Sequence, residues 1–337
     1  MIDRNCKTLR PCVERFASQA TFAAEVTTLL TLVRGATNPG WKIGSLRGVS
    51  PDQDRRLRVA AIGFLNPAPL MWDFEHAPLD DVLEKRYLID RMTPSECAAR
   101  LADGRADIGL IPIASLATVP ELKVLPGCTI ASKGRVRSLI LVHRANRPPG
   151  KLRSVAADAA SRTTLAYARI MFNKWGNAEV PFLPMVADLD AMLERADAAI
   201  LIGDPALLAL EERYNRLERT GEELAYRDLA EEWRALTGLV FVSAVWSTAR
   251  GGPLDQSVAE DFIRSRDHGL ANIDVLVSEW SARIPIPEAT IRTYLTANIH
   301  YTLDVECVEG MRGFFRMAAE CGVLPSYNVE VPELATR

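Results

Sequence analysis

The sequence has few of the features that mark a disulfide framework, a zinc site or a nucleotide-binding loop. Its six cysteines are dispersed without a CxxC pair, its four histidines are scattered, and it contains neither a P-loop nor a GxGxxG motif. Dispersed cysteines favour reduced thiols over disulfides or zinc ligands. We therefore expect no metal and no cofactor.

The charge pattern excludes further classes of partner. The net charge is -3, both signs are interspersed, and there is no dense run of Lys or Arg, so we expect neither nucleic acid nor a membrane as partner. The mildly apolar stretch 21–33 is interrupted by Glu25 and followed by Arg34. This pattern predicts no export signal and no membrane span, and hence a cytoplasmic protein.

The length and composition favour two lobes. A chain of 337 residues with 48% hydrophobic residues can fill two cores. We predict an N-terminal extension and linker over 1–56, partly disordered, because Gly, Pro, Ser and Asp are frequent before residue 55. We assign 57–145 and 246–330 to a discontinuous first lobe and 146–245 to a second, with the first crossing at Asn146–Gly150.

The stretch LRVAAIGFLNPAPL, residues 57–70, carries the first candidate site residue. An apolar run with small residues predicts a buried strand that ends at Gly63, and Pro67 and Pro69 suit the first turn of a helix. Asn66 would then stand at the carboxyl end of a strand, where ligands of open α/β sheets bind. Its alternative role is that of an ordinary turn residue.

Alternating strands and helices over the rest of the chain predict an α/β fold with two parallel-rich sheets flanked by helices. Thr93 with Glu96 predicts a capping box, and the end of the strand 106–111 brings Ser115 to the same sheet edge as Asn66. The expected strands are 86–92, 106–111, 122–130, 136–142, 154–157, 180–183, 198–202 and 239–246. The expected C-terminal helices are 254–283, 288–303 and 305–321.

Two further helix starts are candidate anion sites. Ser161, Arg162, Thr163 and Thr164 combine hydroxyls, free N–H groups and a guanidinium, which can hold a carboxylate. Gly203-Asp204-Pro205 offers a second helix start. Each has a plain structural interpretation as a helix cap, and for Asp204 we weigh that interpretation above a carboxylate facing a cleft.

Several blocks in fixed order resemble the chorismate dehydratase family of the futalosine route to menaquinone. The blocks are Phe64-Leu65-Asn66 with Pro69-Leu70, Gly134-x-Val136-x-Ser138, Ser161-Arg162-Thr163, Ile202-Gly203-Asp204 with Ala206-Leu207, and Trp233 with Thr237-Gly238-Leu239 and Phe241-Val242 to Ala244-Val245-Trp246. The resemblance covers about residues 57–325. The chain departs from it at Val240 and Ser243, where the family has Pro and Phe, and in the extension before Leu57.

The resemblance implies a bilobed fold like that of type 2 periplasmic binding proteins, and a cytosolic hydro-lyase that converts chorismate to 3-[(1-carboxyvinyl)oxy]benzoate. It places Asn66 and Ser138 at catalytic positions. From the strand ends and helix starts themselves we expect Ser115, Ser161–Thr164, Gly203 and Asp204 to bind the substrate. Because no His, Glu or Lys in these blocks occupies an obvious base position, our hypothesis is that the enolpyruvyl carboxylate of the substrate takes the proton, with Asp204 as the alternative base. The alternative functions are a 1,4-dihydroxy-6-naphthoate synthase-like enzyme and an organic-anion-binding protein.

Overall fold

The computed structural model describes residues 56–158, 162–249, 252 and 255–332. The extension over 1–56, except for its last residue, and Ser161 lie outside the described residues and stay predictions. Within the described ranges, no helix is both long enough and apolar enough to cross a lipid bilayer.

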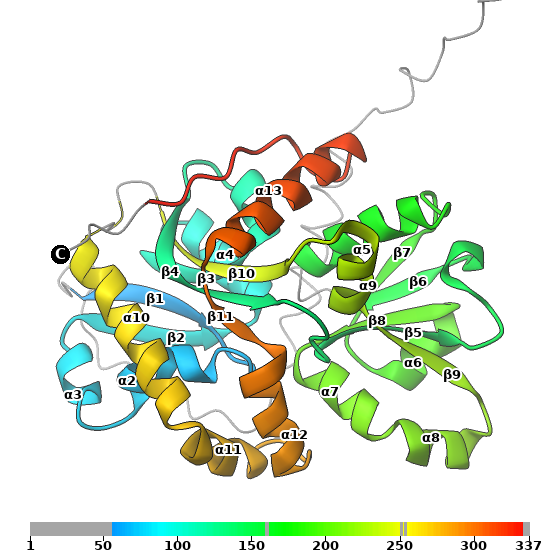
Figure 1. Cartoon of the computed structure of the whole chain (residues 1–337), viewed down its shortest axis with the longest axis horizontal. Helices are drawn as coiled ribbons and strands as arrows, with labels where there is room; N and C mark the ends of the chain where they lie inside the picture. Colours follow the sequence, from blue (N-terminus) through cyan, green and yellow to red (C-terminus); the bar gives the residue numbers. More distant parts are fainter. Residues whose placement is uncertain (1–55, 159–161, 250–251, 253–254, 333–337) are drawn as a thin grey trace, which may run out of the picture. The chain divides into compact units, whose positions relative to one another are not determined.

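The first sheet has six strands in the order β11-β4-β10-β3-β1-β2 (Figure 1). β1 pairs in parallel with β2 and β3, whereas β10 pairs antiparallel with β3 and β4, and β11 antiparallel with β4. The sheet is therefore mixed. Its strands are β1 (Leu57–Ile62), β2 (Tyr87–Met92), β3 (Ile108–Pro112), β4 (Lys123–Ser132), β10 (Phe241–Thr248) and β11 (His300–Thr302).

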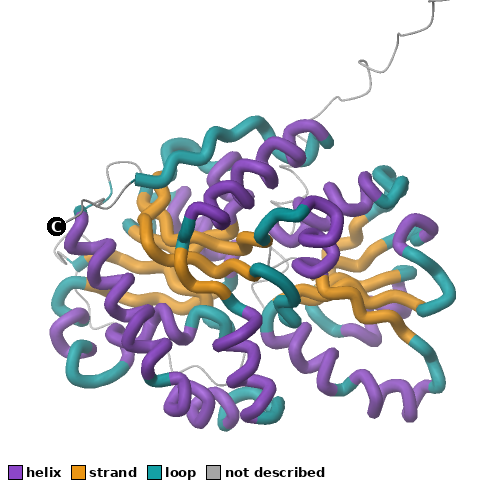
Figure 2. The backbone as a smooth tube through the Cα atoms, in the orientation of Figure 1, coloured by secondary structure: helices purple, strands orange, loops and turns teal. Residues whose placement is uncertain are grey.

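The second sheet has five strands in the order β7-β6-β8-β5-β9. β6 pairs in parallel with β7 and β8, and β5 pairs antiparallel with β8 and β9. Its strands are β5 (Leu139–Arg144), β6 (Val155–Asp158), β7 (Phe182–Met185), β8 (Ala198–Ile202) and β9 (Leu224–Asp228). Figure 2 shows the strands of the two sheets as separate groups, each with helices beside it, which confirms the bilobed α/β prediction. Parallel pairs do not predominate in either sheet, so the prediction of parallel-rich sheets is wrong, because β10, β11 and β5 join their neighbours antiparallel.

Helices alternate with strands along much of the chain, as the sequence pattern predicts. At α4, Thr93 accepts a hydrogen bond from the Glu96 N–H while the Glu96 carboxylate accepts one from the Thr93 N–H, which confirms the capping box. The helices up to β9 are η2 (Ala68–Met71), α2 (Trp72–Glu75), α3 (Asp80–Leu83), α4 (Pro94–Ala102), η3 (Ile113–Ala117), η4 (Pro149–Lys151), α5 (Arg162–Lys174), α6 (Leu189–Arg195), α7 (Asp204–Glu211) and α8 (Arg213–Thr220). The later ones are α9 (Leu229–Thr237), α10 (Gln256–Ala271), α11 (Ile273–Ser281), α12 (Glu288–Thr293), the π-helical turn η5 (Tyr294–Asn298) and α13 (Val305–Glu320).

The C-terminal segment is helical, but not in the three continuous pieces that we expected. The stretch 254–283 breaks at Asn272 into α10 and α11. The stretch 288–303 ends its helix in η5 and then joins the first sheet as β11. Gly269 in α10 has a packing reason, because a Cβ there would lie 2.1 Å from the carbonyl oxygen of Pro69, in η2, which follows Asn66. Helix α10 thus packs directly on η2.

The predicted crossing at Asn146–Gly150 is wrong. β5 hydrogen-bonds to β8 and β9, so the chain has already entered the second sheet before residue 139, within the segment 133–138. A Pro- and Gly-rich stretch marks a loop, but it does not say which sheet the flanking strands join. We therefore propose that the first lobe includes 57–132 and the described residues between 241 and 332, and that the second begins within 133–138.

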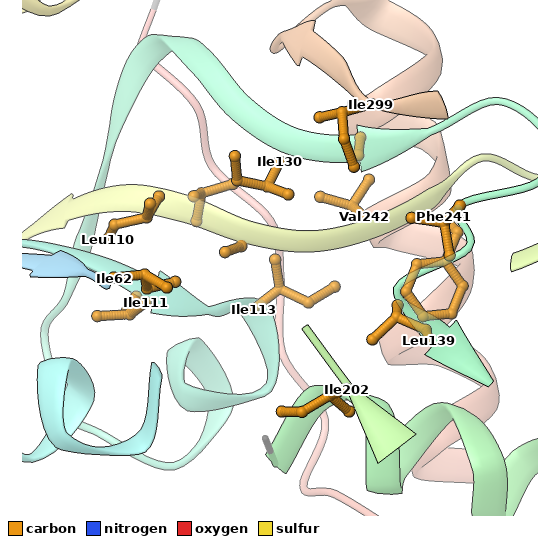
Figure 3. Packing of buried hydrophobic residues seen from close by; sticks show 14 of the residues in the cluster. Ile62, Leu110, Ile111, Ile113, Ile130, Leu139, Ile202, Phe241, Val242 and Ile299 are labelled. Carbon is orange, nitrogen blue, oxygen red and sulfur yellow. The ribbon is translucent and has the colours of Figure 1, made fainter. Parts of the chain in front are cut away.

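A continuous apolar core joins the two sheets at this crossing. One cluster of buried residues includes Ile62 and Ile111 of the first sheet together with Leu139 and Ile202 of the second. Figure 3 shows Leu139 and Phe241, which lie next to the two inter-sheet segments, close to one another. Residues at the ends of the two connections between the lobes are therefore packed into this core.

Candidate functional site

The loop after β1 carries Asn66 and contacts the start of helix α7. The Leu65 N–H donates to Asp204 Oδ1 at 3.1 Å, and the ring of Phe64 packs on Gly203, where an added Cβ would lie 2.8 Å from a ring carbon. Asn66 is partly buried, and its Oδ1 is buried without a hydrogen-bond partner in the described part of the chain. A buried acceptor without a partner costs free energy unless a ligand or water satisfies it.

Asp204 is not the cap of its helix. Gly203, with φ +63°, occupies the N-cap position and Asp204 begins α7, with no side-chain capping bond. Burial raises the pKa of Asp204 to about 6, and the Leu65 N–H opposes that shift in part. The preferred structural interpretation, a simple helix cap, is therefore wrong, and the carboxylate instead bridges to the other lobe.

Ser138 lies beside the same helix start. It is 2% exposed, and its carbonyl oxygen accepts a hydrogen bond from Gly203 N–H at 2.8 Å. Burial raises the pKa of Tyr294, and the charges of Asp204 and Asp228 raise this pKa further. A side-chain hydrogen bond with Ser138 lowers it in part. Ser138, Gly203, Asp204 and Tyr294 thus share one neighbourhood.

The start of helix α5 makes the second contact between the lobes. Thr163 Oγ1 accepts a hydrogen bond from the Ala114 N–H of η3 at 3.0 Å, and Thr163 and Thr164 are both buried. Ser115, the next residue of η3, is 0% exposed, and its Oγ has no partner in the described ranges. This contact brings Ser115 and the α5 start together.

Arg162, the first residue of α5, places a positive charge at this helix start. Arg162 is exposed, yet surrounding protein atoms partly desolvate the guanidinium and lower its pKa. No carboxylate among the described residues pairs with it. An unpaired, partly desolvated guanidinium is suited to an external carboxylate.

Sheet register aligns the two contacts. β1 and β3 are parallel neighbours, so the Asn66 loop and η3 leave the same edge of the first sheet. β8 and β6 are also parallel neighbours, so α7 and α5 begin at the same edge of the second sheet. Leu65–Asp204 and Ala114–Thr163 then join the two edges. This arrangement brings the described candidate residues to one junction between the lobes.

The sequence interpretation missed two residues of this neighbourhood. Tyr294 belongs to a π-helical turn in a stretch that we expected to be plain helix, and Asp228 ends β9, a strand that we did not predict. Asp228 precedes an ordinary helix start, which could have drawn attention to it as a cap. No sequence signal that we recognised indicated Tyr294.

A group of three potential metal ligands lies elsewhere in the fold. His300, Asp304 and Cys307 have ligand atoms within 4.8 Å of one another. The Lys133 ammonium already binds the Asp304 carboxylate at 2.8 Å, and burial raises the pKa of the Cys307 thiol to about 12. A protonated thiol and an ammonium-bound carboxylate are poor metal ligands, so this group does not fit a metal ion.

Comparison with known proteins gives one family match and many structural ones. A family model described as menaquinone biosynthesis matches residues 57–320. The structure resembles protein AF1704 from Archaeoglobus fulgidus, with 13% identity, coverage of 81% of this chain and 100% of that one, and a TM-score of 0.59. It also resembles the alkanesulfonate-binding protein SsuA from Xanthomonas axonopodis pv. citri, bound to MOPS, with 18% identity, 80% and 94% coverage and a TM-score of 0.55.

A third similar structure is the Candida albicans CA3427 gene product, which is described as having the generic periplasmic binding protein fold. It has 15% identity, coverage of 81% of this chain and 92% of that one, and a TM-score of 0.54. At these identities the likeness shows the fold alone. It confirms the predicted bilobed fold of the periplasmic-binding-protein type.

The raised pKa of Asp204 predicts a pH-dependent effect of Asp204→Asn on stability. Below about pH 4 the Asp204 carboxyl is protonated in both folded and unfolded chains, so its ionisation does not change the free energy of unfolding of the wild type. Between the unfolded pKa of 3.8 and the folded pKa of about 6, the unfolded chain ionises first, so the wild type loses stability as pH rises. We expect the free energy of unfolding of D204N to exceed that of the wild type by up to about 3 kcal/mol above pH 6.

Urea unfolding of both proteins at pH 4, 5, 6 and 7.5 measures this difference. Asn retains an oxygen that can accept the Leu65 N–H, so the comparison changes mainly the charge. A difference that does not grow between pH 4 and pH 6 would contradict the burial of an ionisable Asp204.

Proposed function

Because this chain belongs to the menaquinone biosynthesis family, we propose that it is a cytoplasmic chorismate dehydratase that forms 3-[(1-carboxyvinyl)oxy]benzoate. The observation that carries the proposal is the pair of contacts, Leu65 with Asp204 and Ser138 with Gly203, that brings the Asn66 loop and Ser138 to the start of α7, with Arg162 at the start of the neighbouring helix α5. This junction offers hydrogen-bond donors and a guanidinium that pairs with no carboxylate of the described ranges, which suits a small dicarboxylate without phosphate.

Substrate binding would use the α5 start and its surroundings. The guanidinium of Arg162 and the N-terminal N–H groups of a 13-residue helix favour one carboxylate of chorismate. The unpartnered Oγ of Ser115 and Oδ1 of Asn66 are buried polar atoms that a bound molecule or water would satisfy. These groups fix the ring between the two lobes in the proposed complex.

The reaction would proceed by proton removal followed by loss of hydroxide. The C–H bond at the ring carbon that bears the enolpyruvyl ether breaks, and its electron pair delocalises toward the ring carboxylate. The neighbouring hydroxyl then leaves and the ring becomes aromatic, which drives the reaction. Preorganised donors at Asn66 and Ser138 would each lower the barrier by about 3 kcal/mol.

The enolpyruvyl carboxylate of the substrate serves as the base in this proposal. Positioning a base within the reacting molecule contributes about 7–11 kcal/mol to rate acceleration, so the protein needs only to hold the conformer. Asp204 is the competing candidate, because a pKa of about 6 leaves it largely ionised at neutral pH. The two candidate bases give opposite dependences of kcat/KM on pH.

An organic-anion-binding protein is the second candidate function. The fold is shared with an alkanesulfonate-binding protein, and an unpaired Arg at a helix start can bind an anion without catalysis. Such a protein would bind chorismate and release it unchanged. A 1,4-dihydroxy-6-naphthoate synthase-like enzyme would also leave chorismate unchanged, so a single assay separates both from the proposed lyase.

Removal of the Asn66 or Ser138 side chain should slow dehydration without unfolding the protein. We expect N66A and S138A each to lower kcat by about 100-fold, because each loses a donor aimed at developing charge. The measurement is aromatic product by absorbance and by a loss of one water from chorismate in mass spectrometry, with no cofactor added. Ser247→Ala is the matched control, since Ser247 is a buried serine in β10 whose Oγ has no partner among the described residues.

Full activity of both variants, or equal losses in S247A, would contradict the assigned roles. Unchanged chorismate with the wild type would contradict the lyase itself.

The pH profile identifies the base. If the substrate carboxylate takes the proton, ionisation of Asp204 near pH 6 only adds negative charge beside a dianionic substrate, so kcat/KM should fall as pH rises through about 6. Asp204→Asn should flatten this step and lower kcat by less than about tenfold.

The competing base gives the reverse result. A kcat/KM that rises through about pH 6, together with a loss of about four orders of magnitude in D204N, would assign the base to Asp204 and overturn the substrate-assisted proposal.

A further inference from the structure

Asp228 accepts four backbone hydrogen bonds with a single carboxylate. Two come from Ala230 and Glu231, both at 3.1 Å, at the start of helix α9. The other two come from a distant part of the chain, Val136 at 3.0 Å and Arg137 at 2.6 Å. Asp228 is 7% exposed, so these bonds form in a nearly dry environment.

Helix capping accounts for only half of this arrangement. A capping Asp accepts bonds from the second and third residues of its own helix, as Asp228 does at α9. Asp188 caps α6 in the same lobe and, within the part of the chain that the structure describes, its side chain accepts a hydrogen bond from Ala191 alone, at 3.0 Å. The bonds to Val136 and Arg137 therefore need a separate explanation.

The segment held by Asp228 leads directly into Ser138. Arg137 has φ +65°, a left-handed conformation that costs free energy for a residue other than glycine. Asn298 Nδ2 donates to the Arg135 carbonyl at 3.1 Å, and the Ser138 carbonyl accepts from Gly203 at 2.8 Å. Three separate parts of the chain thus fix consecutive residues of this crossing segment.

Burial raises the pKa of Asp228, while the N–H groups of Arg137, Val136 and Glu231 oppose the shift. The carboxylate is thus compensated by backbone donors, and no Arg or Lys side chain pairs with it within the described residues. Its contacts are all with backbone, which is the pattern expected of a group that shapes a segment.

We infer that Asp228 is a positioning residue, which holds Val136 and keeps Arg137 in the left-handed conformation that presents the Ser138 side chain to the junction between the lobes. This inference rests on the proposed function for its effect on catalysis. Its structural half, the clamping of the segment before Ser138, stands independently of any substrate.

The test replaces Asp228 with Ser, which remains a good helix cap but has one short hydroxyl arm. Serine can cap α9, yet it cannot also accept bonds from Val136 and Arg137. Asp188→Ser is the matched control, because it makes the same substitution at a helix cap without a second pair of bonds. Asp228→Asn, which keeps the side-chain volume and one acceptor oxygen, provides a second variant if D228S does not fold.

Kinetics separate positioning from stability. We expect D228S to lower kcat by at least about tenfold with little change in KM, and D188S to leave both unchanged. In a Ser138→Ala background, D228S should cause no further loss, because the two act as one unit. A loss in D228S that adds in full to that of S138A would overturn the inference.

Amide hydrogen exchange tests the structural half without chorismate. We expect the N–H groups of Val136 and Arg137 to exchange at least about tenfold faster in D228S than in the wild type, and to be unchanged in D188S. If the wild type does not convert chorismate but this exchange result holds, the proposed function fails, whereas the inference that Asp228 fixes Val136 and Arg137 stands. Unchanged exchange of these two N–H groups in both D228S and D228N would overturn the inference that Asp228 fixes this segment.

Discussion

Two backbone N–H groups of the first lobe are satisfied by side chains from the second. Leu65 donates to Asp204 and Ala114 donates to Thr163, and each acceptor lies in the first turn of a helix. The donors follow parallel neighbours in one sheet, and the acceptor helices follow parallel neighbours in the other. These two contacts bring the polar ends of both sheets together, with Asn66 and Ser115 each next to a donor residue.

The junction has electrostatic features that are expensive to maintain without a ligand. Asp204 is desolvated, Arg162 has no carboxylate partner within the described ranges, and Asn66 and Ser115 each bury an acceptor without a partner. Structures that serve only stability rarely accumulate such groups, because each one costs free energy. At the junction two such atoms occur together with a desolvated carboxyl group and a guanidinium, a combination typical of a binding or catalytic site.

Local sequence signals predicted local structure well. The strand 198–202 and the helix 189–195 have the predicted bounds, and the capping box at Thr93 forms as the spacing of its residues requires. The sequence did not show which strands pair with one another in the sheets. β5 and β9 are defined by their neighbours in the second sheet, so the crossing was misplaced and Asp228 passed unnoticed. Tyr294 reaches Ser138 only through a π-helical turn that has no recognisable residue pattern.

The site residues followed the same division. Asn66, Ser115 and Arg162–Thr164 stand at ends of strands and starts of helices, where sequence rules apply. Whether Asp204 caps its own helix or crosses to Leu65 depends on the approach of the other lobe, which no local rule specifies.

A crystal structure with the product 3-[(1-carboxyvinyl)oxy]benzoate tests the central claim most directly. Our account predicts one carboxylate within hydrogen-bond distance of Arg162 and the start of α5, and the ring between Asn66 and Ser138. The product bound instead in the pocket of about 180 Å³ whose lining includes Arg135, Arg137 and Arg213 would contradict it.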